Sequence, residues 1–289
     1  MSLFWDWSRI LLCSAVLALC AVSAVAATEL KGPSTVEAGQ DANLTSTGDG
    51  STTLYLFGPA GAAKRVVQRG SIRIPGEDLQ TAGRYTAIVD GAAASFLVTP
   101  APLDKLAFIA RPSRVPTAAN GAVQGSAFLF DRYQNLVLAP TSVVFHLGVE
   151  GAQAEERSVT GKDGVAWVQL NSGRRSGPAQ FTASSGEASV RRVVQQVAAD
   201  PCSLHMRAAR TPNGNILVET DPIRDCSGNA VPDGTIVTFA SVDADGRSTV
   251  DARIKRGFAR AELPPSGSAT LSVAAGVVLG NEIRWGGGQ

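Results

Sequence analysis

The chain contains the stretch Asp131-Arg-Tyr-Gln-Asn135-Leu-Val137 and repeats it, without a gap, as Asp225-Cys-Ser-Gly-Asn229-Ala-Val231. Each copy is followed at the same distance by a short strand-forming run, Val143-Val-Phe145 in one and Val237-Thr-Phe239 in the other. Further along, Gly164-Val-Ala166-Trp-Val-Gln-Leu170 matches Gly257-Phe-Ala259-Arg-Ala-Glu-Leu263. The matched positions are turn formers and residues that would face inward. The repeat therefore predicts a duplicated scaffold and not a duplicated catalytic site.

The runs around these repeats alternate with a period of two, which is typical of β-strands that bury one face. In the run 165–170, one face would hold Ala166, Val168 and Leu170, and the other would hold Val165, Trp167 and Gln169. Asp-Gly turns at 49–50, 90–91, 163–164, 233–234 and 245–246, with Asn-Gly turns at 120–121 and 213–214, separate such runs. Short strands at regular turn spacing predict an all-β chain of sandwiches.

Proline-rich breaks divide the chain at Thr99-Pro-Ala-Pro102 and at Ala198-Ala-Asp-Pro201. Proline removes a backbone donor and stiffens the chain, so these segments are expected to be linkers. We predict a signal segment at 1–27 and three domains at 28–99, 104–199 and 200–284.

The pattern Asp-x-x-Gly-Asn-x-Val, with a Val-x-Phe strand and a later Gly-x-Ala strand, resembles the bacterial immunoglobulin-like (Ig-like) domain of the invasin and intimin type. The resemblance covers both 104–199 and 200–284. Three departures from the family pattern are Gln134 in place of Gly, and Leu136 and Ala230 in place of Pro. The resemblance implies three tandem Ig-like β-sandwiches, because 28–99 has an Ig-like signature of its own. It also implies a role in adhesion.

That signature is Thr81-Ala-Gly83-Arg-Tyr85-Thr-Ala87, which resembles the Asp-x-Gly-x-Tyr-x-Cys turn of Ig sandwiches. Thr and Ala stand at the Asp and Cys positions. Tyr85 is expected to be the corner tyrosine, whose hydroxyl bonds back to the main chain.

The first 27 residues have the layout of an export signal. A positive residue, Arg9, precedes an apolar run, and the run ends in Ala24-Val-Ala26-Ala27. An uncleaved membrane anchor is the alternative, and the membrane would then be contacted only through this segment. Either way the protein is expected to be exported, and to be periplasmic, cell-surface or secreted.

Two cysteines, Cys202 and Cys226, remain after the signal segment. Two thiols in an oxidising compartment usually pair, and the second domain lacks a thiol at both corresponding positions. We predict a disulfide between Cys202, which is expected to open the first strand of the third domain, and Cys226. A reactive catalytic cysteine is the competing interpretation.

The Asp131/Asn135 and Asp225/Asn229 pairs recur at fixed spacing in loops. Such side chains bond nearby backbone N–H groups, so we interpret both pairs as structural locks between two strands. On this basis Asp225→Ala is expected to cost about 1 kcal/mol, one local hydrogen bond. A cation site is the alternative.

No catalytic, cofactor or metal motif is recognisable in the sequence, and we assign no catalytic residue, no cofactor and no metal. His146 and His205 lie in different domains and receive no role. The 26 basic and 25 acidic groups balance, so nucleic acid is not an expected partner.

The leading hypothesis is a non-enzymatic, exported Ig-like binding or spacer protein of the bacterial envelope, with adhesion as its role by analogy. Its partner would be a protein or a cell surface. The alternative is an accessory subunit of a periplasmic or secreted enzyme or of a secretion assembly. A hydrolase is the third and weakest class.

Overall fold

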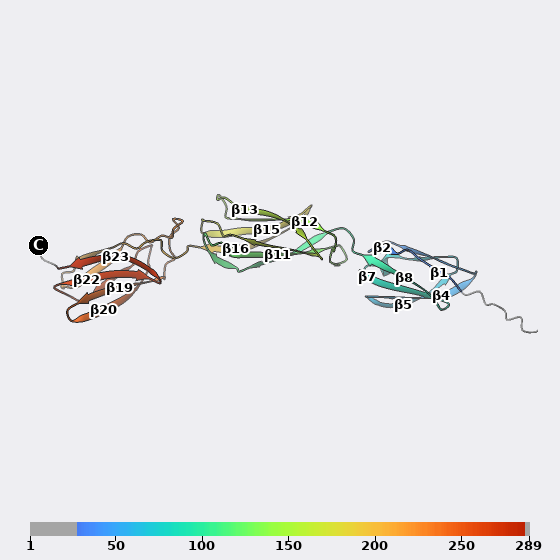
Figure 1. Ribbon diagram of the computed structural model, residues 1–289, viewed down its shortest axis with the longest axis horizontal. Helices are drawn as coiled ribbons and strands as arrows, with labels where there is room; N and C mark the ends of the chain where they lie inside the picture. Colours follow the sequence, from blue (N-terminus) through green and yellow to red (C-terminus); the bar gives the residue numbers. More distant parts are fainter. Residues whose placement is uncertain (1–27, 287–289) are drawn as a thin grey trace, which may run out of the picture. The chain divides into compact units, whose positions relative to one another are not determined.

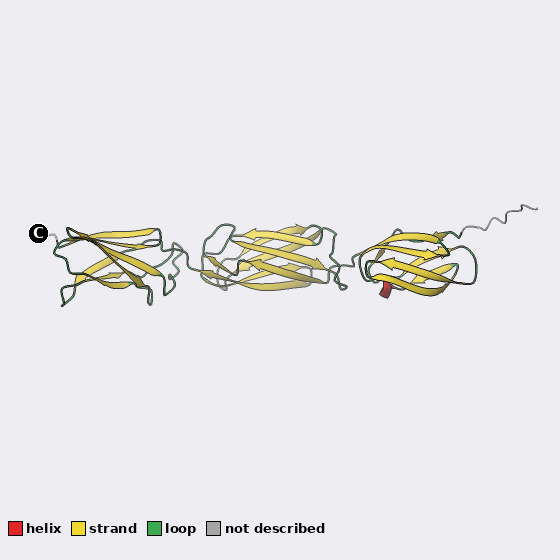
Figure 2. Cartoon of the chain, turned by 90° about the horizontal axis from the view of Figure 1, so that it is seen from below, coloured by secondary structure: helices red, strands yellow, loops and turns green. Residues whose placement is uncertain are grey.

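A computed structural model describes residues 28–286 of the chain, so the expected signal segment at 1–27 lies outside the described residues. The chain divides into two compact units, residues 1–99 and 100–289. Strands and loops make up nearly all of the described part, and the short red helix in Figure 2 is the 3₁₀ turn Gly76–Asp78 of the first unit.

The first unit consists of two sheets that enclose one core. A five-stranded sheet has the order β2-β8-β7-β4-β5 and a three-stranded sheet has the order β1-β3-β6. The strands are β1 (Leu30–Lys31), β2 (Thr35–Glu37), β3 (Ala42–Ser46), β4 (Ser51–Gly58), β5 (Gly61–Gln68), β6 (Ser71–Ile74), β7 (Gly83–Val89) and β8 (Ala92–Thr99). All neighbours are antiparallel except β2 and β8. Strands β7 and β8 form the closing hairpin around Asp90-Gly91.

The second unit contains two pairs of sheets. One pair has the orders β10-β16-β15-β12-β13 and β14-β11-β9. We call this pair the second sandwich, because the first unit is the first sandwich of the chain. Its strands are β9 (Lys105–Arg111), β10 (Arg114–Pro116), β11 (Val123–Phe130), β12 (Thr141–Gly148), β13 (Glu155–Gly161), β14 (Val165–Leu170), β15 (Gly177–Ser185) and β16 (Ala188–Val197). Strand β10 runs parallel to β16, and the other neighbours are antiparallel.

The other pair of sheets in this unit, which we call the third sandwich, has the orders β17-β18-β21 and β20-β19-β22-β23. Its strands are β17 (Met206–Arg210), β18 (Ile216–Thr220), β19 (Ile236–Asp243), β20 (Gly246–Arg253), β21 (Arg260–Leu263), β22 (Ala269–Ala275) and β23 (Val278–Trp285). Figure 1 shows the strands of this sandwich in orange and red.

Each sandwich of the second unit has its own hydrophobic core, built from the inward positions of its strands. In the second sandwich, Phe108 and Phe181 meet edge to face, with ring centroids 4.9 Å apart. Phe145 of the second core and Phe239 of the third occupy matching positions of the repeat, and both are fully buried. The prediction of an all-β chain of Ig-like sandwiches is therefore confirmed.

Candidate functional site

The two aspartate-centred loops are the most distinctive polar features of the second unit. Asp131 is completely buried, and its Oδ1 accepts the backbone N–H groups of Tyr133 at 2.9 Å and Asn135 at 2.8 Å. Its Oδ2 accepts the Asn135 side-chain amide at 2.8 Å and the backbone N–H of Ala101 at 2.9 Å. Ala101 belongs to the linker that enters the second sandwich. The loop therefore fixes both itself and the incoming chain.

Asp225 repeats this arrangement at the start of the third sandwich. Its Oδ1 accepts the backbone N–H groups of Ser227 at 2.9 Å and Asn229 at 2.8 Å. Its Oδ2 accepts the Asn229 amide at 2.9 Å and the backbone N–H of Ala199, in the incoming linker, at 3.1 Å. Both linker contacts precede the expected domain starts at 104 and 200. The loops thus reach beyond the boundaries drawn from the sequence.

The Asp225 loop also bonds to the second sandwich, which the sequence did not indicate. Thr117, buried just after β10, donates its hydroxyl to Asp225 Oδ2 at 2.6 Å. The Asn229 amide donates to the carbonyl of Arg174 at 2.7 Å and accepts the backbone N–H of Ser176 at 2.9 Å. We call this set of contacts the joint. It links residues up to 108 positions apart and fastens one sandwich to the next.

The hydrogen-bond donors in these loops argue against the alternative that the Asp and Asn pairs bind a cation. Each carboxylate oxygen of Asp131 and of Asp225 already accepts at least two N–H or O–H donors, which fills its lone-pair directions. A metal ion would face positive hydrogen ends where it needs free oxygen. Among residues 28–286, no cluster of three metal-ligating side chains is formed.

Burial and hydrogen bonding act in opposite directions on the two carboxyl groups. Burial alone would raise the pKa of Asp225, but hydrogen bonds from Thr117, Asn229 and Ala199 outweigh it and hold the pKa below its usual value. Burial likewise opposes the bonds from Asn135 and Ala101 that hold the pKa of Asp131 below its usual value. Both groups are therefore held as carboxylates in the folded protein.

Low pH is expected to lower the stability of the second unit, because Asp131 and Asp225 become protonated. Because their folded pKa values are depressed, their stabilisation is complete above the unfolded pKa, near 4, and is lost as pH falls through the folded values. We expect the free energy of unfolding in urea to fall between pH 5 and pH 3. A free energy that stays level across this range would contradict the assignment.

The linker contacts also make a prediction about fragments. We propose that 104–199 and 200–284 are separately folding domains whose stability includes the linker before each. Fragment 198–289 keeps Ala199, whereas fragment 201–289 lacks this donor to Asp225. The longer fragment should be more stable by about 1 kcal/mol, measured by urea unfolding of both under oxidising conditions. Equal stability would show that the linker contact contributes nothing.

The predicted disulfide is confirmed: Cys202 and Cys226 are bonded to each other. The expectation that Cys202 opens the first strand is wrong, because β17 begins at Met206. Cys202 instead lies in the linker, where its backbone N–H donates to the carbonyl of Arg224 at 2.9 Å. The disulfide therefore fastens the same linker to the same loop as Asp225 does.

In the first unit, Tyr85 is buried and its hydroxyl donates to the carbonyl of Thr81 at 3.0 Å. This is the bond that defines a tyrosine corner. Its ring stacks on Phe96 and fills the space beside Gly58, where a Cβ would collide with it. Burial raises the pKa of the Tyr85 hydroxyl, so this group remains a neutral donor.

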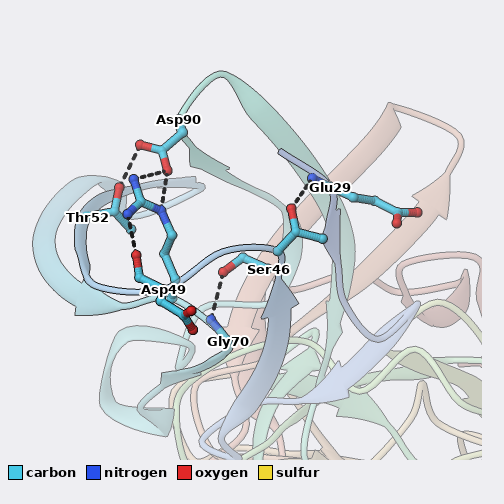
Figure 3. A network of polar contacts seen from close by, with 8 residues as sticks. Glu29, Ser46, Asp49, Thr52, Gly70 and Asp90 are labelled. Carbon is cyan, nitrogen blue, oxygen red and sulfur yellow. Dashed lines mark hydrogen bonds and ion pairs between the residues drawn. The ribbon is translucent and has the colours of Figure 1, made fainter. Parts of the chain in front are cut away.

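One end of the first unit is tied by a polar network around Asp90 (Figure 3). Thr52 donates its hydroxyl to Asp90 Oδ1 at 2.7 Å, and Arg69 donates to Oδ2 at 2.9 Å. Arg69 also bonds the carbonyl of Asp49 at 2.8 Å. The bonds from Thr52 and Arg69 hold the pKa of Asp90 below its usual value. The network therefore joins the turns at Asp49, Arg69 and Asp90.

The two histidines do not form a shared site. His146 is half-buried on β12 of the second sandwich, and His205 is exposed just before β17 of the third. Within residues 28–286 neither histidine bonds to a carboxylate, so the described part of the chain assembles no relay of the Ser-His-Asp type around them.

No protein-family model matches the chain, and no curated protein sequence matches it. Solved structures do. FdeC, an adhesin of Escherichia coli, superposes with a TM-score of 0.56 and 15% identity over 86% of this chain and 92% of that one. InvD of Yersinia pseudotuberculosis superposes with a TM-score of 0.50 and 14% identity over 89% and 96%.

Invasin, a bacterial integrin-binding protein, superposes with a TM-score of 0.50 and 15% identity over 87% of this chain. The chain spans only 57% of that structure. Identities this low establish similarity of fold and nothing finer. At that level the resemblance inferred from the Asp-x-x-x-Asn repeats is confirmed: the chain has the Ig-like sandwich fold of the bacterial adhesins FdeC, InvD and invasin.

Proposed function

We propose that the chain is a non-enzymatic, exported protein of adhesion type that acts at the bacterial envelope and binds a protein or a cell surface. The single observation that carries the proposal is the joint. The polar groups of Thr117, Asp225 and Asn229 form the hydrogen bonds that hold the second sandwich to the third. A device of this kind positions surfaces for binding, and it performs no chemistry.

The state of the buried carboxylates also supports a non-enzymatic role. A general base needs a lone pair within reach of a substrate proton. The oxygens of Asp131 and Asp225 are occupied by the protein's own donors, and their depressed pKa values make them poor proton acceptors. Neither group is therefore available for catalysis.

An exported location is supported by the layout of the first 27 residues and by the disulfide, since disulfides persist in oxidising compartments. Within residues 28–286, there is no helix with the length and apolar character needed to cross a bilayer. The fold shared with FdeC, InvD and invasin supports adhesion by analogy.

The test combines cell fractionation with binding. The full chain is produced with its first 27 residues, and washed producing cells, periplasm and medium are probed for it. The purified exported protein is then added to intact cells. Retention on washed cells and saturable binding to added cells are expected. Failure to bind cells, together with one stoichiometric envelope protein in a pull-down, would overturn adhesion in favour of the accessory subunit.

A further inference from the structure

Trp167 is a large aromatic side chain that points out of the second sandwich. It lies on the outward face of β14, and 53% of its surface is exposed. On that face its register neighbour is Ser126 of β11, and Ile109 of β9 follows beyond it. Exposing an indole costs the free energy that its burial would release. Because Trp167 and Ile109 are both exposed on this face, Trp167 is a candidate binding group.

A hollow of about 480 Å³ lies beside Trp167. Its lining includes Asn120, Arg157, Val159, Gln169 and Asn171, which come from the edges of β13 and β14 and from the loop before β11. The lining thus combines the Trp167 ring and apolar valine side chains with amide and guanidinium groups that can form hydrogen bonds. Small-molecule sites have this composition: an apolar surface with a few fixed polar groups.

The side-chain amides of Gln169 and Asn171 are each hydrogen-bonded through one atom, and among residues 28–286 the other polar atom of each has no partner. Gln169 Nε2 donates to the carbonyl of Gly121 at 2.7 Å, and Asn171 Oδ1 accepts the backbone N–H of Gly121 at 2.7 Å. Arg157 donates to the carbonyl of Gln169 at 3.2 Å. Within the described residues, Gln169 Oε1, Asn171 Nδ2 and the Asn120 amide have no hydrogen-bond partner. Gln169 Oε1 and Asn171 Nδ2 therefore offer one acceptor and one donor whose positions are set by the bonded end of each amide.

A sugar ring fits this combination. One face of a pyranose carries C–H groups that can stack on an indole, and its rim carries hydroxyls that both donate and accept hydrogen bonds. A polyanion fits less well, because the Arg157 guanidinium, the one charged group in the lining, is paired with the Glu155 carboxylate at 3.6 Å, and the hollow has no excess positive charge. We propose that this hollow binds a pyranose unit of a glycan, stacked on Trp167.

The third sandwich provides an internal contrast. In the repeat, Arg260 stands at the position of Trp167, and Glu262 stands at the position of Gln169. The third sandwich therefore lacks both the ring and the amide at these positions. The glycan site is therefore a property of the second sandwich, and the contrast supplies the substitution that should abolish it.

The inference rests on the proposed function, because it names the ligand class through which the chain would bind a surface. The test uses the full exported chain on an array of neutral and acidic glycans, followed by calorimetric titration of the glycan bound best. Trp167→Ala and Trp167→Arg should each weaken binding at least tenfold. Phe57→Ala, which removes an exposed aromatic from the first unit, should leave binding unchanged. Thermal unfolding of each variant checks that it is folded.

The outcomes separate the inference from the proposed function. If the chain binds cells and no glycan on the array, the site is wrong while the adhesion proposal stands. Glycan binding that survives Trp167→Ala would also overturn the site. Cell binding that is lost in Trp167→Ala and resists removal of cell-surface glycans would assign the Trp167 face to a protein partner, against the proposal. Failure to bind both cells and glycans would count against both.

Discussion

Replacing Asp225 with alanine is expected to destabilise the third sandwich by about 3 kcal/mol, because the change leaves several donors without their acceptor. These donors are the Thr117 hydroxyl, the Ala199 N–H, the Ser227 N–H and the Asn229 groups. The sequence-based expectation of about 1 kcal/mol counted one local bond. Urea unfolding followed by tryptophan fluorescence in a Trp167→Phe background, in which Trp285 on β23 reports on the third sandwich, gives the measurement.

Two controls accompany this variant. Asp243→Ala removes a carboxylate that caps only the exposed backbone N–H of Asp245, and should change stability by less than about 0.5 kcal/mol. Thr117→Val removes only the hydroxyl that joins the second sandwich to Asp225, and should cost about 1 kcal/mol. It should also broaden the distances measured between spin labels on the two sandwiches. An Asp225→Ala protein as stable as the parent would contradict the account of the joint.

Replacing Cys202 and Cys226 together with alanine is expected to cost the third sandwich about 3 kcal/mol in the chain-entropy account. The two cysteines are 24 residues apart, so the unfolded chain loses a closed loop of that length. Thermal unfolding of the parent and the double variant gives the change. Reductant should lower the midpoint of the parent and leave that of the variant unaltered. Equal midpoints for the two proteins under oxidising conditions would rule out a stabilising role.

The strand pattern could be predicted from the sequence because alternation reports directly on burial. Ala166, Val168 and Leu170 were expected to share an inward face, and all three are buried. The disulfide could be predicted from the count of two thiols in a chain that is expected to be exported. The position of Cys202 did not, because a backbone bond to Arg224 and the pairing of Pro201 with Asp225 keep it in the linker, ahead of β17.

The joint and the hollow could not be predicted because both depend on residues far apart in the chain. Thr117 is 108 positions from Asp225, and nothing in its surrounding sequence marks it. The hollow beside Trp167 forms because the loop at Asn120 lies against β14. The alternation of apolar and polar residues along a strand carries no information about that contact. Patterns of period two define faces of strands, but they do not say which loops meet.

The Asp131 loop shows how tertiary contacts override a local preference. Gln134 stands where the third sandwich has Gly228, and it adopts the same left-handed backbone, with φ of 71° against 85°. That conformation costs a residue with a Cβ about 1 to 2 kcal/mol. The bond from its N–H to the carbonyl of Asp131, at 3.1 Å, is nevertheless kept. The aspartate and asparagine thus set the loop, and glycine at this position is optional.

The parallel pairs β2–β8 and β10–β16 determine how these sandwiches respond to pulling. In each pair a strand near the start of the sandwich lies beside the last strand of the same sandwich. Tension on the two ends of the sandwich therefore shears these two strands past each other. Their hydrogen bonds must then break together instead of one by one. The sheets described for the third sandwich contain no such pair, but they have the disulfide. By closing 24 residues, that bond withholds about 80 Å of chain from extension, and unfolding under force releases correspondingly less length.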